Sequence, residues 1–543
     1  MTIDRGMTVE PGATVGQGPG SRGAMLAMRV RGLLGTPRSY WLTRFMILRL
    51  LGLVYFVAFL SLARQVLPLI GRDGLLPAHL FLERVAAHFG SRWEGFEQFP
   101  SFFWVALSDR WLAGLAWAGA GLSLLVLFGF ANAILMLLLW ALYFSFVQVG
   151  QDWYGYGWEI QLLETGFLAV FLCPLLDARP FPRRAPPAAV IWLFRWLIFR
   201  IMIGAGLIKL RGDPCWRDLT CLDFHYETQP IPNPLSRTLH FMPRWFGKLG
   251  VLYNHLNELV APWFAFGPRA ARCVAGLLML SFQVVLIASG NLSFLNWLTI
   301  VPILACFDDS LLRRALPRRL VAAADRAAAG ARPSRAQRLA VPALVGVVAL
   351  LSIAPIENLL SSHQAMNTSF NRLALVNTYG AFGSVGRERA QIIFEGTDDP
   401  EPTDRSVWKE YDYKCQPSDP DRRPCIISPY HYRLDWQIWF AAMSSPARYP
   451  WTLHLVAKLL RNDPGALDLL AGNPFPAAPP RFIRAQLYRY EFAPPGDPRG
   501  AWWRRTLIGG WLPPLSADDP RLRRALAAYG WLDSEEAAGI RRE

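Results

Sequence analysis

The stretch Ala131–Val149, with the sequence ANAILMLLLWALYFSFVQV, decides the fold class of this chain. It contains no charged residue, and most of its side chains are aliphatic or aromatic. A helix needs roughly 17–25 mostly apolar residues to cross the hydrocarbon core of a bilayer. The stretch therefore predicts a membrane-spanning helix.

Further apolar segments lie on both sides of this stretch. Together they predict about nine spans, at residues 45–66, 110–129, 131–149, 160–176, 190–210, 251–267, 271–289, 293–306 and 340–356. The segment 293–306 is short and contains Pro302, so a re-entrant segment is an alternative there. Arg44 and Arg49 are expected at or just inside the start of the first span. No signal-peptide pattern precedes that span, and residues 1–40 are expected to form a disordered tail.

The composition agrees with a membrane protein. Hydrophobic residues make up 52% of the chain and charged residues only 18%, and the formal net charge is +15. A nucleic-acid-binding protein concentrates such charge on one folded face or helix. Here the arginines lie in the loops between apolar segments, so the lipid bilayer is the expected partner and nucleic acid is not.

The arginines also predict an orientation, because basic loops of membrane proteins remain in the cytoplasm. The basic segments are the N-terminal tail, the loops near Arg183 and Arg269, and Phe307–Arg338, which has eight arginines and three aspartates. All four fall on one side if nine spans follow a cytoplasmic N-terminus. The predicted organisation is a tail (1–40), a transmembrane domain (41–356) with an exoplasmic loop (211–250) and a cytoplasmic loop (307–339), and an exoplasmic soluble domain (357–543).

The C-terminal domain has a different character from the spans. Its Pro/Gly-rich turns separate candidate strands at Gln391–Glu395, Val407–Tyr413 and Arg481–Phe492, and apolar helical segments follow Arg433 and Trp451. A segment of this length can bury its own core. The predicted fold class is therefore an α-helical polytopic membrane protein with a C-terminal mixed α/β or β-rich domain.

Four cysteines form two close pairs on the predicted exoplasmic side. Cys215 and Cys221 share one loop, and Cys415 and Cys425 share the soluble domain. Because that side is oxidising, each pair predicts a local disulfide. A zinc site is the weaker alternative, since no Cys-x-x-Cys occurs and no histidine stands at ligand spacing. The remaining cysteines lie in spans and are expected to behave as small hydrophobic residues: Cys173, Cys273 and Cys306.

The sequence offers little that resembles catalytic machinery. It has no nucleophile elbow, P-loop, dinucleotide fingerprint or His-Glu-x-x-His motif, and neither a cofactor nor a metal is predicted. His431 and Asp435 are four residues apart. That spacing is typical of a local hydrogen bond at a helix start, with a ligand or acid–base pair as the alternative.

Ionisable residues within spans are more informative, because a charge in lipid must be compensated. We expect Glu164 in the fourth span to pair with Arg200 in the fifth, which also carries Arg195 and Lys209. A structural role is the preferred interpretation of these charges, with a functional role as the alternative. Lys209 is expected near the exoplasmic interface, where its side chain can reach the headgroups.

The stretch after Lys209 carries a resemblance to a known family. The matching motifs are Trp158-Glu159, Leu163-Glu164-Thr165-Gly166-Phe167, PCWRDLTC at 214–221, HYETQP at 225–230, PNPL at 232–235, NTYG at 377–380, YHYRLDW at 430–436 and LYRY at 487–490. They extend over roughly residues 40–500. In these motifs the chain resembles the lipase maturation factor family.

The resemblance implies a membrane-anchored folding or assembly factor that acts on secreted client proteins such as lipases. Eukaryotic relatives reside in the endoplasmic reticulum membrane, with a lumenal C-terminal region implicated in client binding. The arginine- and alanine-rich composition is typical of a bacterial inner-membrane protein, whose exoplasmic side is the periplasm. The residues expected to form a client-binding surface are Trp216, His225, Tyr226, Glu227, Gln229, His431, Arg433, Asp435 and Trp436. For the proline-rich loop 225–235, packing against the C-terminal domain is the alternative.

A membrane-embedded enzyme is the second hypothesis. Residues 204–210, GAGLIKL, followed by Trp216, distantly resemble the vitamin K-dependent γ-carboxylases. In that reading Lys209 is the candidate base, because a desolvated lysine can lose its proton near neutral pH. A transporter is a third possibility.

The orientation is testable with reporter fusions. Green fluorescent protein fused after Arg338 should fluoresce, because the basic loop keeps that position in the cytoplasm. An export-dependent phosphatase should be active only when it is fused within residues 357–543. Reversed signals from the two reporters would contradict the nine-span arrangement.

Overall fold

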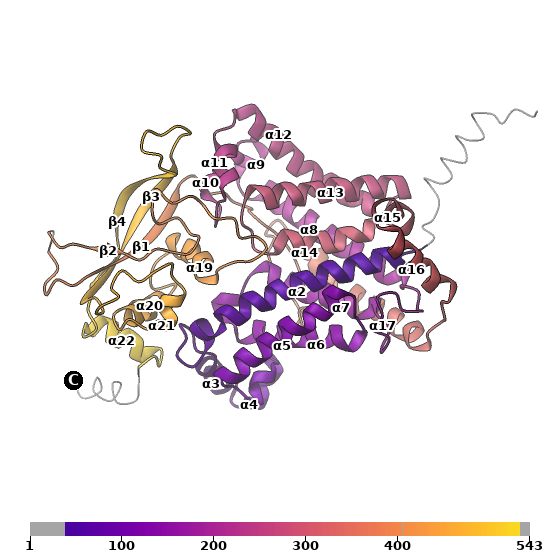
Figure 1. The fold of residues 1–543 in the computed structure, drawn as a ribbon, viewed down its shortest axis with the longest axis horizontal. Helices are drawn as coiled ribbons and strands as arrows, with labels where there is room; N and C mark the ends of the chain where they lie inside the picture. The colour runs from indigo at the N-terminus through magenta and orange to yellow at the C-terminus, as the bar shows by residue number, and fades with distance from the viewer. Residues whose placement is uncertain (1–38, 404, 533–543) are drawn as a thin grey trace, which may run out of the picture.

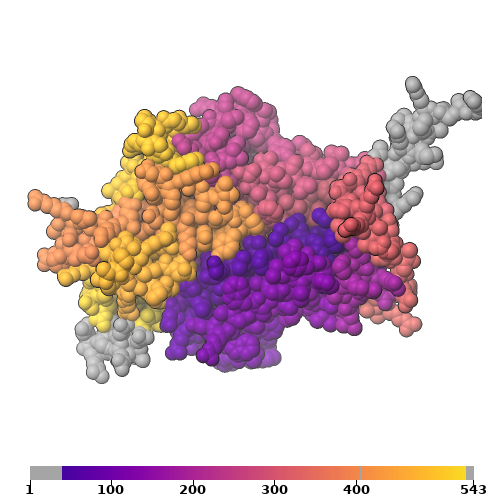
Figure 2. Space-filling view, in the orientation of Figure 1, coloured from indigo at the N-terminus to yellow at the C-terminus, as the bar shows by residue number. Residues whose placement is uncertain are grey.

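The computed structural model describes residues 39–403 and 405–532. A bundle of helices forms one part of the molecule, and a smaller mixed α/β domain lies against one end of it (Figure 1). The orange and yellow residues of that domain are in broad contact with the helical part (Figure 2). Nearly all of the predicted N-terminal tail lies outside the described residues.

The helical part contains most of the secondary structure. Its α-helices are α2 (Trp41–Ile70), α3 (Ala78–Phe89), α4 (Arg92–Gln98), α5 (Asp109–Phe128), α6 (Ala133–Val149), α7 (Gly157–Leu172), α8 (Ala188–Arg211), α9 (Pro214–Arg217), α10 (Leu222–Thr228), α11 (Pro234–His240), α12 (Arg244–His255), α13 (Arg269–Ser289), α14 (Leu295–Ile303), α15 (Asp309–Ala315), α16 (Arg318–Ala329), α17 (Arg335–Leu351) and α18 (Ile353–Leu360). Shorter turns of helix are η1 (Phe102–Trp104), η2 (Gln151–Tyr154), η3 (Leu256–Val260), η4 (Ala261–Phe266) and η5 (Leu304–Cys306).

Fewer helices than expected have the length and composition of a full span. Within the described residues five qualify, at Trp41–Ile70, Asp109–Phe128, Ala188–Arg211, Arg269–Ser289 and Arg335–Leu360, and two shorter apolar helices lie at Ala133–Val149 and Leu295–Cys306. The expected span 251–267 is not one regular helix: a π-turn (η3) and a 3-10 turn (η4) follow α12, and η4 contains Pro262. Proline lacks the backbone N–H that a continuous α-helix requires. The membrane character is therefore supported, but the count of nine spans is not confirmed.

A distant carboxylate fixes the start of the first long helix. Asp309 accepts hydrogen bonds from the backbone N–H groups of Trp41 (2.9 Å) and Leu42 (2.8 Å) and from the hydroxyl of Ser39 (2.5 Å). The first N–H groups of a helix have no partner within the helix, so they need such an acceptor. Asp309 thereby joins α2 to α15 at the end of the bundle that lies away from the C-terminal domain (Figure 1).

The C-terminal domain is built on one antiparallel sheet. Its strands are β1 (Arg389–Thr397), β2 (Lys409–Glu410), β3 (Phe482–Phe492) and β4 (Trp503–Leu515), in the order β2-β1-β3-β4. Its helices are α19 (Arg433–Ala442), α20 (Trp451–Leu459), α21 (Pro464–Asp468) and α22 (Pro520–Ala528). The mixed α/β prediction is confirmed. The strand expected at Val407–Tyr413 shrinks to two residues, and β4 was not predicted because its Gly and Pro pairs are typical of turns.

The predicted pair of Glu164 and Arg200 is present and buried. The two side chains are 1% and 2% exposed and form an ion pair between α7 and α8. The Glu164 carboxylate also accepts a hydrogen bond from the hydroxyl of Tyr379 (2.7 Å), while Arg200 donates to the carbonyl of Asn377 (2.6 Å). The pair therefore holds the segment that leads into the C-terminal domain as well as two helices.

Arg195, which lies about one and a half turns before Arg200 in α8, is paired differently. Its guanidinium donates to the carbonyl of Ala305 (2.9 Å) and to the hydroxyl of Tyr40 (2.8 Å). No carboxylate among the described residues lies within ion-pair distance of it. Its donors are nevertheless used, so Arg195 ties α8 to η5 and to the start of α2.

Neutralising Glu164 should destabilise the protein strongly. Replacing it with glutamine leaves Arg200 buried without a counter-ion, a change that costs about 3–5 kcal/mol in buried pairs. We expect E164Q to lower the melting temperature in detergent. The matched control is D177N, which removes a partner from the exposed pair Asp177–Arg179 and should change the free energy of unfolding by less than about 0.5 kcal/mol. Equal melting temperatures for the two variants would contradict a structural role for the pair.

Candidate functional site

The residues expected to bind a client converge on the junction between the helical part and the C-terminal domain. All nine are at most 8% exposed: Trp216, His225, Tyr226, Glu227, Gln229, His431, Arg433, Asp435 and Trp436. They cannot form an accessible client-binding surface in this structure. The prediction of their role is therefore corrected: their aromatic rings and polar groups pack within the junction.

Arg433 makes the central contact of this junction. Its guanidinium donates to the Glu159 carboxylate of α7 at 2.8 Å, and both side chains are fully buried. It lies over the ring of Tyr154 at 3.6 Å from the ring centroid and also donates to the carbonyl of Trp153. The hydroxyl of Tyr143 donates to the other oxygen of Glu159. An arginine of the C-terminal domain is thus held entirely by groups of the helical part.

The residues just before α19 extend this contact. The amide of Gln65 in α2 donates to the carbonyl of His431 (3.0 Å), and its oxygen accepts from the backbone N–H of Arg433 (2.8 Å). The Nδ1 of His431 lies 2.9 Å from the hydroxyl of Ser293. Burial, together with the nearby Arg433 charge, holds the pKa of His431 well below its usual value. This histidine therefore stays neutral, as the interior of the junction requires.

Asp435 does not bond to His431, contrary to the expected local hydrogen bond. Its carboxylate accepts from the backbone N–H groups of Cys415 (2.5 Å) and Gln416 (2.7 Å). Burial raises the pKa of Asp435 to about 6 despite these two donors. Cys415 is bonded to Cys425, so Asp435 fixes the start of that disulfide loop against α19.

The proline-rich loop 225–235 also packs inside the junction, so the packing alternative is correct. The Gln229 amide donates to the hydroxyl of Ser236 and the carbonyl of Ser289, both at 3.0 Å. Glu227 accepts from the backbone N–H of Phe492 (2.7 Å), and burial raises its pKa. Substitution of these two residues would therefore disturb the fold, because buried partners would be left unpaired.

Arg389 binds the same loop from the other side and was not singled out from the sequence. It is 1% exposed, and its guanidinium donates to the carbonyls of Glu227 (3.1 Å), Gln229 (2.5 Å) and Pro230 (2.9 Å). It also donates to the side-chain oxygen of Gln416 (2.6 Å). An isolated arginine at the first position of a strand forms no sequence pattern from which such a role could be predicted.

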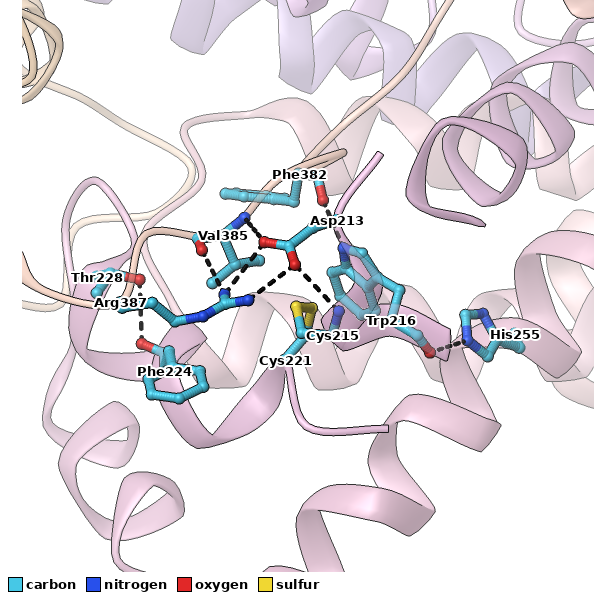
Figure 3. The surroundings of a disulfide bond; sticks show 10 residues. All are labelled: Asp213, Cys215, Trp216, Cys221, Phe224, Thr228, His255, Phe382, Val385 and Arg387. Carbon is cyan, nitrogen blue, oxygen red and sulfur yellow. Dashed lines mark hydrogen bonds and ion pairs between the residues drawn. A yellow bond between two sulfur atoms is a disulfide. The ribbon is translucent and has the colours of Figure 1, made fainter. Parts of the chain in front are cut away.

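The disulfide between Cys215 and Cys221 lies at the edge of the junction (Figure 3). Asp213 accepts from the backbone N–H of Cys215 (3.0 Å) and from the guanidinium of Arg387 (2.8 Å). The indole N–H of Trp216 donates to the carbonyl of Phe382 (2.8 Å). Both predicted disulfides are present, and the first is joined to the C-terminal domain by these contacts.

Lys209 is buried near this disulfide instead of extending toward solvent. Its ammonium donates to the carboxylate of Glu258 (2.5 Å) and to the side-chain oxygen of Asn254 (3.0 Å). It lies 5.0 Å from the ring centroid of Trp216. The lysine is 3% exposed, so the expected extension to the headgroups is wrong. The ion pair with Glu258 compensates its charge within the fold.

Comparisons with known proteins identify the two parts of the molecule. The model of the lipase maturation factor transmembrane domain matches residues 42–314, and that of the lipase maturation factor C-terminal domain matches residues 375–513. The chain is 50% identical to lipase maturation factor 1 of Bos taurus over 94% of each chain. This chain belongs to the lipase maturation factor family.

Other members of the lipase maturation factor family are also similar to this chain in sequence. Lipase maturation factor 1 of Homo sapiens is 49% identical over 92% of this chain and 93% of its own length, and lipase maturation factor 2 of Homo sapiens is 30% identical over 90% and 85%. No solved structure matches the chain. The matched transmembrane domain and the long apolar helices make this family member an integral membrane protein.

The buried contacts join the two parts of the chain that match the lipase maturation factor models. Glu159 and Arg200 lie within the transmembrane match, whereas Asn377 and Arg433 lie within the C-terminal match. Each ion pair or hydrogen bond between them therefore crosses from one domain to the other. The junction is the candidate functional site, because its contacts hold the C-terminal domain in position against the helical part.

Acidification should destabilise the protein through its buried histidines. Burial, aided by the Lys209 charge, lowers the pKa of His225 to about 4, and burial outweighs the hydrogen bond to the carbonyl of Leu75 in lowering the pKa of His454 to about 4. Both values lie below the roughly 6.5 of an unfolded chain, so the unfolded state binds more protons between these pH values. The stability that they contribute is complete above pH 6.5 and falls as the pH is lowered toward 4.

Melting in detergent at pH 7 and pH 5 measures this effect, with a lower melting temperature expected at pH 5. Asp435 acts in the opposite direction, because its folded pKa lies above its unfolded value. The control is a variant in which His225 and His454 are both glutamine. Its melting temperature should depend less on pH, and an unchanged pH dependence would rule out these two histidines as the cause.

Proposed function

We propose that this chain is a membrane-embedded maturation factor for secreted lipases. The observation that carries the proposal is the 50% identity to a protein named lipase maturation factor 1, over 94% of both chains. An alignment over nearly the whole length includes both ranges of this chain that match the family models. A shared role is therefore supported for the whole molecule and not for one module alone.

The orientation of the chain is part of the proposal. The arginine-rich helices α15 and α16 lie at the end of the bundle opposite to the sheet (Figure 1). Since basic segments remain in the cytoplasm, this arrangement supports a C-terminal domain on the exoplasmic side. Two disulfides on that side fit an oxidising compartment, where a secreted client is also found.

The junction would act in maturation by positioning the C-terminal domain. Arg433 and Arg389 are both buried, and each binds groups that lie far away in the sequence. Such contacts are broken only at a large cost, so the domain is held at one angle to the membrane. A client would then meet a fixed surface close to the bilayer through which it was secreted.

Co-expression tests the proposed function directly. A secreted lipase is produced in cells that lack a maturation factor of their own. The cells carry either an expression plasmid for this chain or the same plasmid without an insert. We expect the ratio of lipase activity to secreted lipase protein to rise at least tenfold when the chain is present, because folding and not secretion is assisted. D177N, altered only at an exposed pair, should act as wild type. An unchanged ratio with the wild-type chain would refute the proposal.

A further inference from the structure

The outermost strand of the sheet is unusually open. β4 pairs with β3 on one side and stands at the end of the order β2-β1-β3-β4. From Arg504 to Ile508 the strand is exposed or half-buried, and Leu507 and Ile508 are 54% and 55% exposed. A sheet edge with apolar side chains is rare in a soluble domain, because it invites pairing with other chains.

The phase of the ladder shows which backbone groups point outward. The N–H of Ala493 donates to the carbonyl of Trp502 (3.0 Å), which is one half of the exchange made by a hydrogen-bonded pair, while the N–H of Trp502, just before the strand, donates to the carbonyl of Pro420 (3.0 Å). Such pairs alternate with non-hydrogen-bonded pairs along an antiparallel ladder. The pairs Tyr490–Arg505 and Tyr488–Leu507 are therefore non-hydrogen-bonded. The N–H and carbonyl groups of Arg505 and Leu507 consequently point away from β3.

The start of the strand agrees with this phase. The N–H of Trp503 also points outward, and it donates to the carbonyl of Pro420 (3.0 Å). Beyond that contact, none of residues 39–403 and 405–532 forms a hydrogen bond with the outer backbone groups of Arg505 or Leu507. The open edge is short, since Ile508 has no partner in β3 and the regular register ends at Leu507.

We propose that the outer edge of β4, from Arg504 to Ile508, binds an extended segment of the client polypeptide as a fifth strand. This inference rests on the proposed function. Strand addition uses backbone hydrogen bonds for affinity and side-chain contacts for preference. Leu507 and Ile508 would favour apolar client side chains.

The edge would bind an incompletely folded client in preference to a folded one, because it recognises an unpaired backbone and not a charge. The charges of Arg504 and Arg505 are neutralised by Asp497 and Glu410, so the edge does not select an acidic partner. An unpaired extended strand is available in an incompletely folded protein and becomes paired when folding is complete. The edge would thus hold a lipase before folding and release it afterwards, as maturation requires.

Peptides with N-methylated backbones test the edge with the wild-type protein. The full chain in lipid nanodiscs is incubated with overlapping peptides of one secreted lipase, each made with a single N-methyl group at successive positions. Because only alternate amides of an added strand face β4, methylation at every second residue should weaken binding about tenfold or more. Methylation at the intervening residues should have little effect. Absence of binding, or loss without this period of two, would overturn the proposal.

A pair of variants tests the same edge from the protein side. L507P removes the outward N–H, and proline is tolerated on edge strands where that group faces solvent. L507A keeps the N–H and is the matched control. Binding of the unmethylated peptide should fall about tenfold or more in L507P and less in L507A. Equal affinities of L507P and wild type would overturn the proposal, as would cross-linking of two copies of the chain through position 507.

The co-expression assay separates this inference from the proposed function. If L507P matures the lipase as well as wild type does, the edge is not the binding site, but the chain remains a maturation factor. If the wild-type chain fails to mature the lipase, the proposed function itself is wrong. Loss of maturation in L507P, with normal expression and melting temperature, supports both.

Discussion

A buried guanidinium needs acceptors for its hydrogen bonds and compensation for its charge, and the architecture of this protein depends on how Arg433 finds both. The side chain starts in the C-terminal domain and ends at Glu159 in the helical part, with no exposure at either partner. Removing such a charge from water costs several kcal/mol unless its partners are well placed. The domain can therefore occupy only the position in which Glu159, Tyr154 and the carbonyl of Trp153 surround the arginine.

The same principle recurs around the junction. Arg200 joins Glu164 to the backbone of Asn377, and Arg389 binds three backbone carbonyls at the end of α10 and in the loop that follows it. In each case the cation and most of its acceptors come from segments far apart in the sequence. Apolar contacts alone tolerate sliding, whereas directional hydrogen bonds define one geometry. The junction therefore behaves as a rigid joint.

The sequence predicted features that follow from local composition or from the cost of charge in lipid. The long apolar helices, β1, β3, both disulfides and the pair Glu164–Arg200 belong to this group. It did not predict Glu258 as the partner of Lys209, because that glutamate lies in a segment read as a continuous span.

The candidate site was harder to predict for a physical reason. Runs rich in Trp, Tyr, His and Arg are found both at binding surfaces and in tightly packed junctions, since both need large rings and directional polar groups. Only the tertiary structure distinguishes the two, through burial. His431 and Arg433 were expected on a surface and lie in the interior. β4, which carries the exposed edge, was missed because Gly509-Gly510 and Pro513-Pro514 resemble turns.

The cap on α2 has a consequence for synthesis of the protein. The Asp309 carboxylate that satisfies the N–H of Trp41 lies 268 residues further along the chain. A ribosome that makes about 5–20 residues per second needs tens of seconds to cover that distance. Throughout this interval the first long helix exists in the membrane with its amino end unsatisfied by its native partner. The first helix is thus completed late in synthesis, and until then its amino end depends on water, lipid headgroups or the insertion machinery for hydrogen-bond partners.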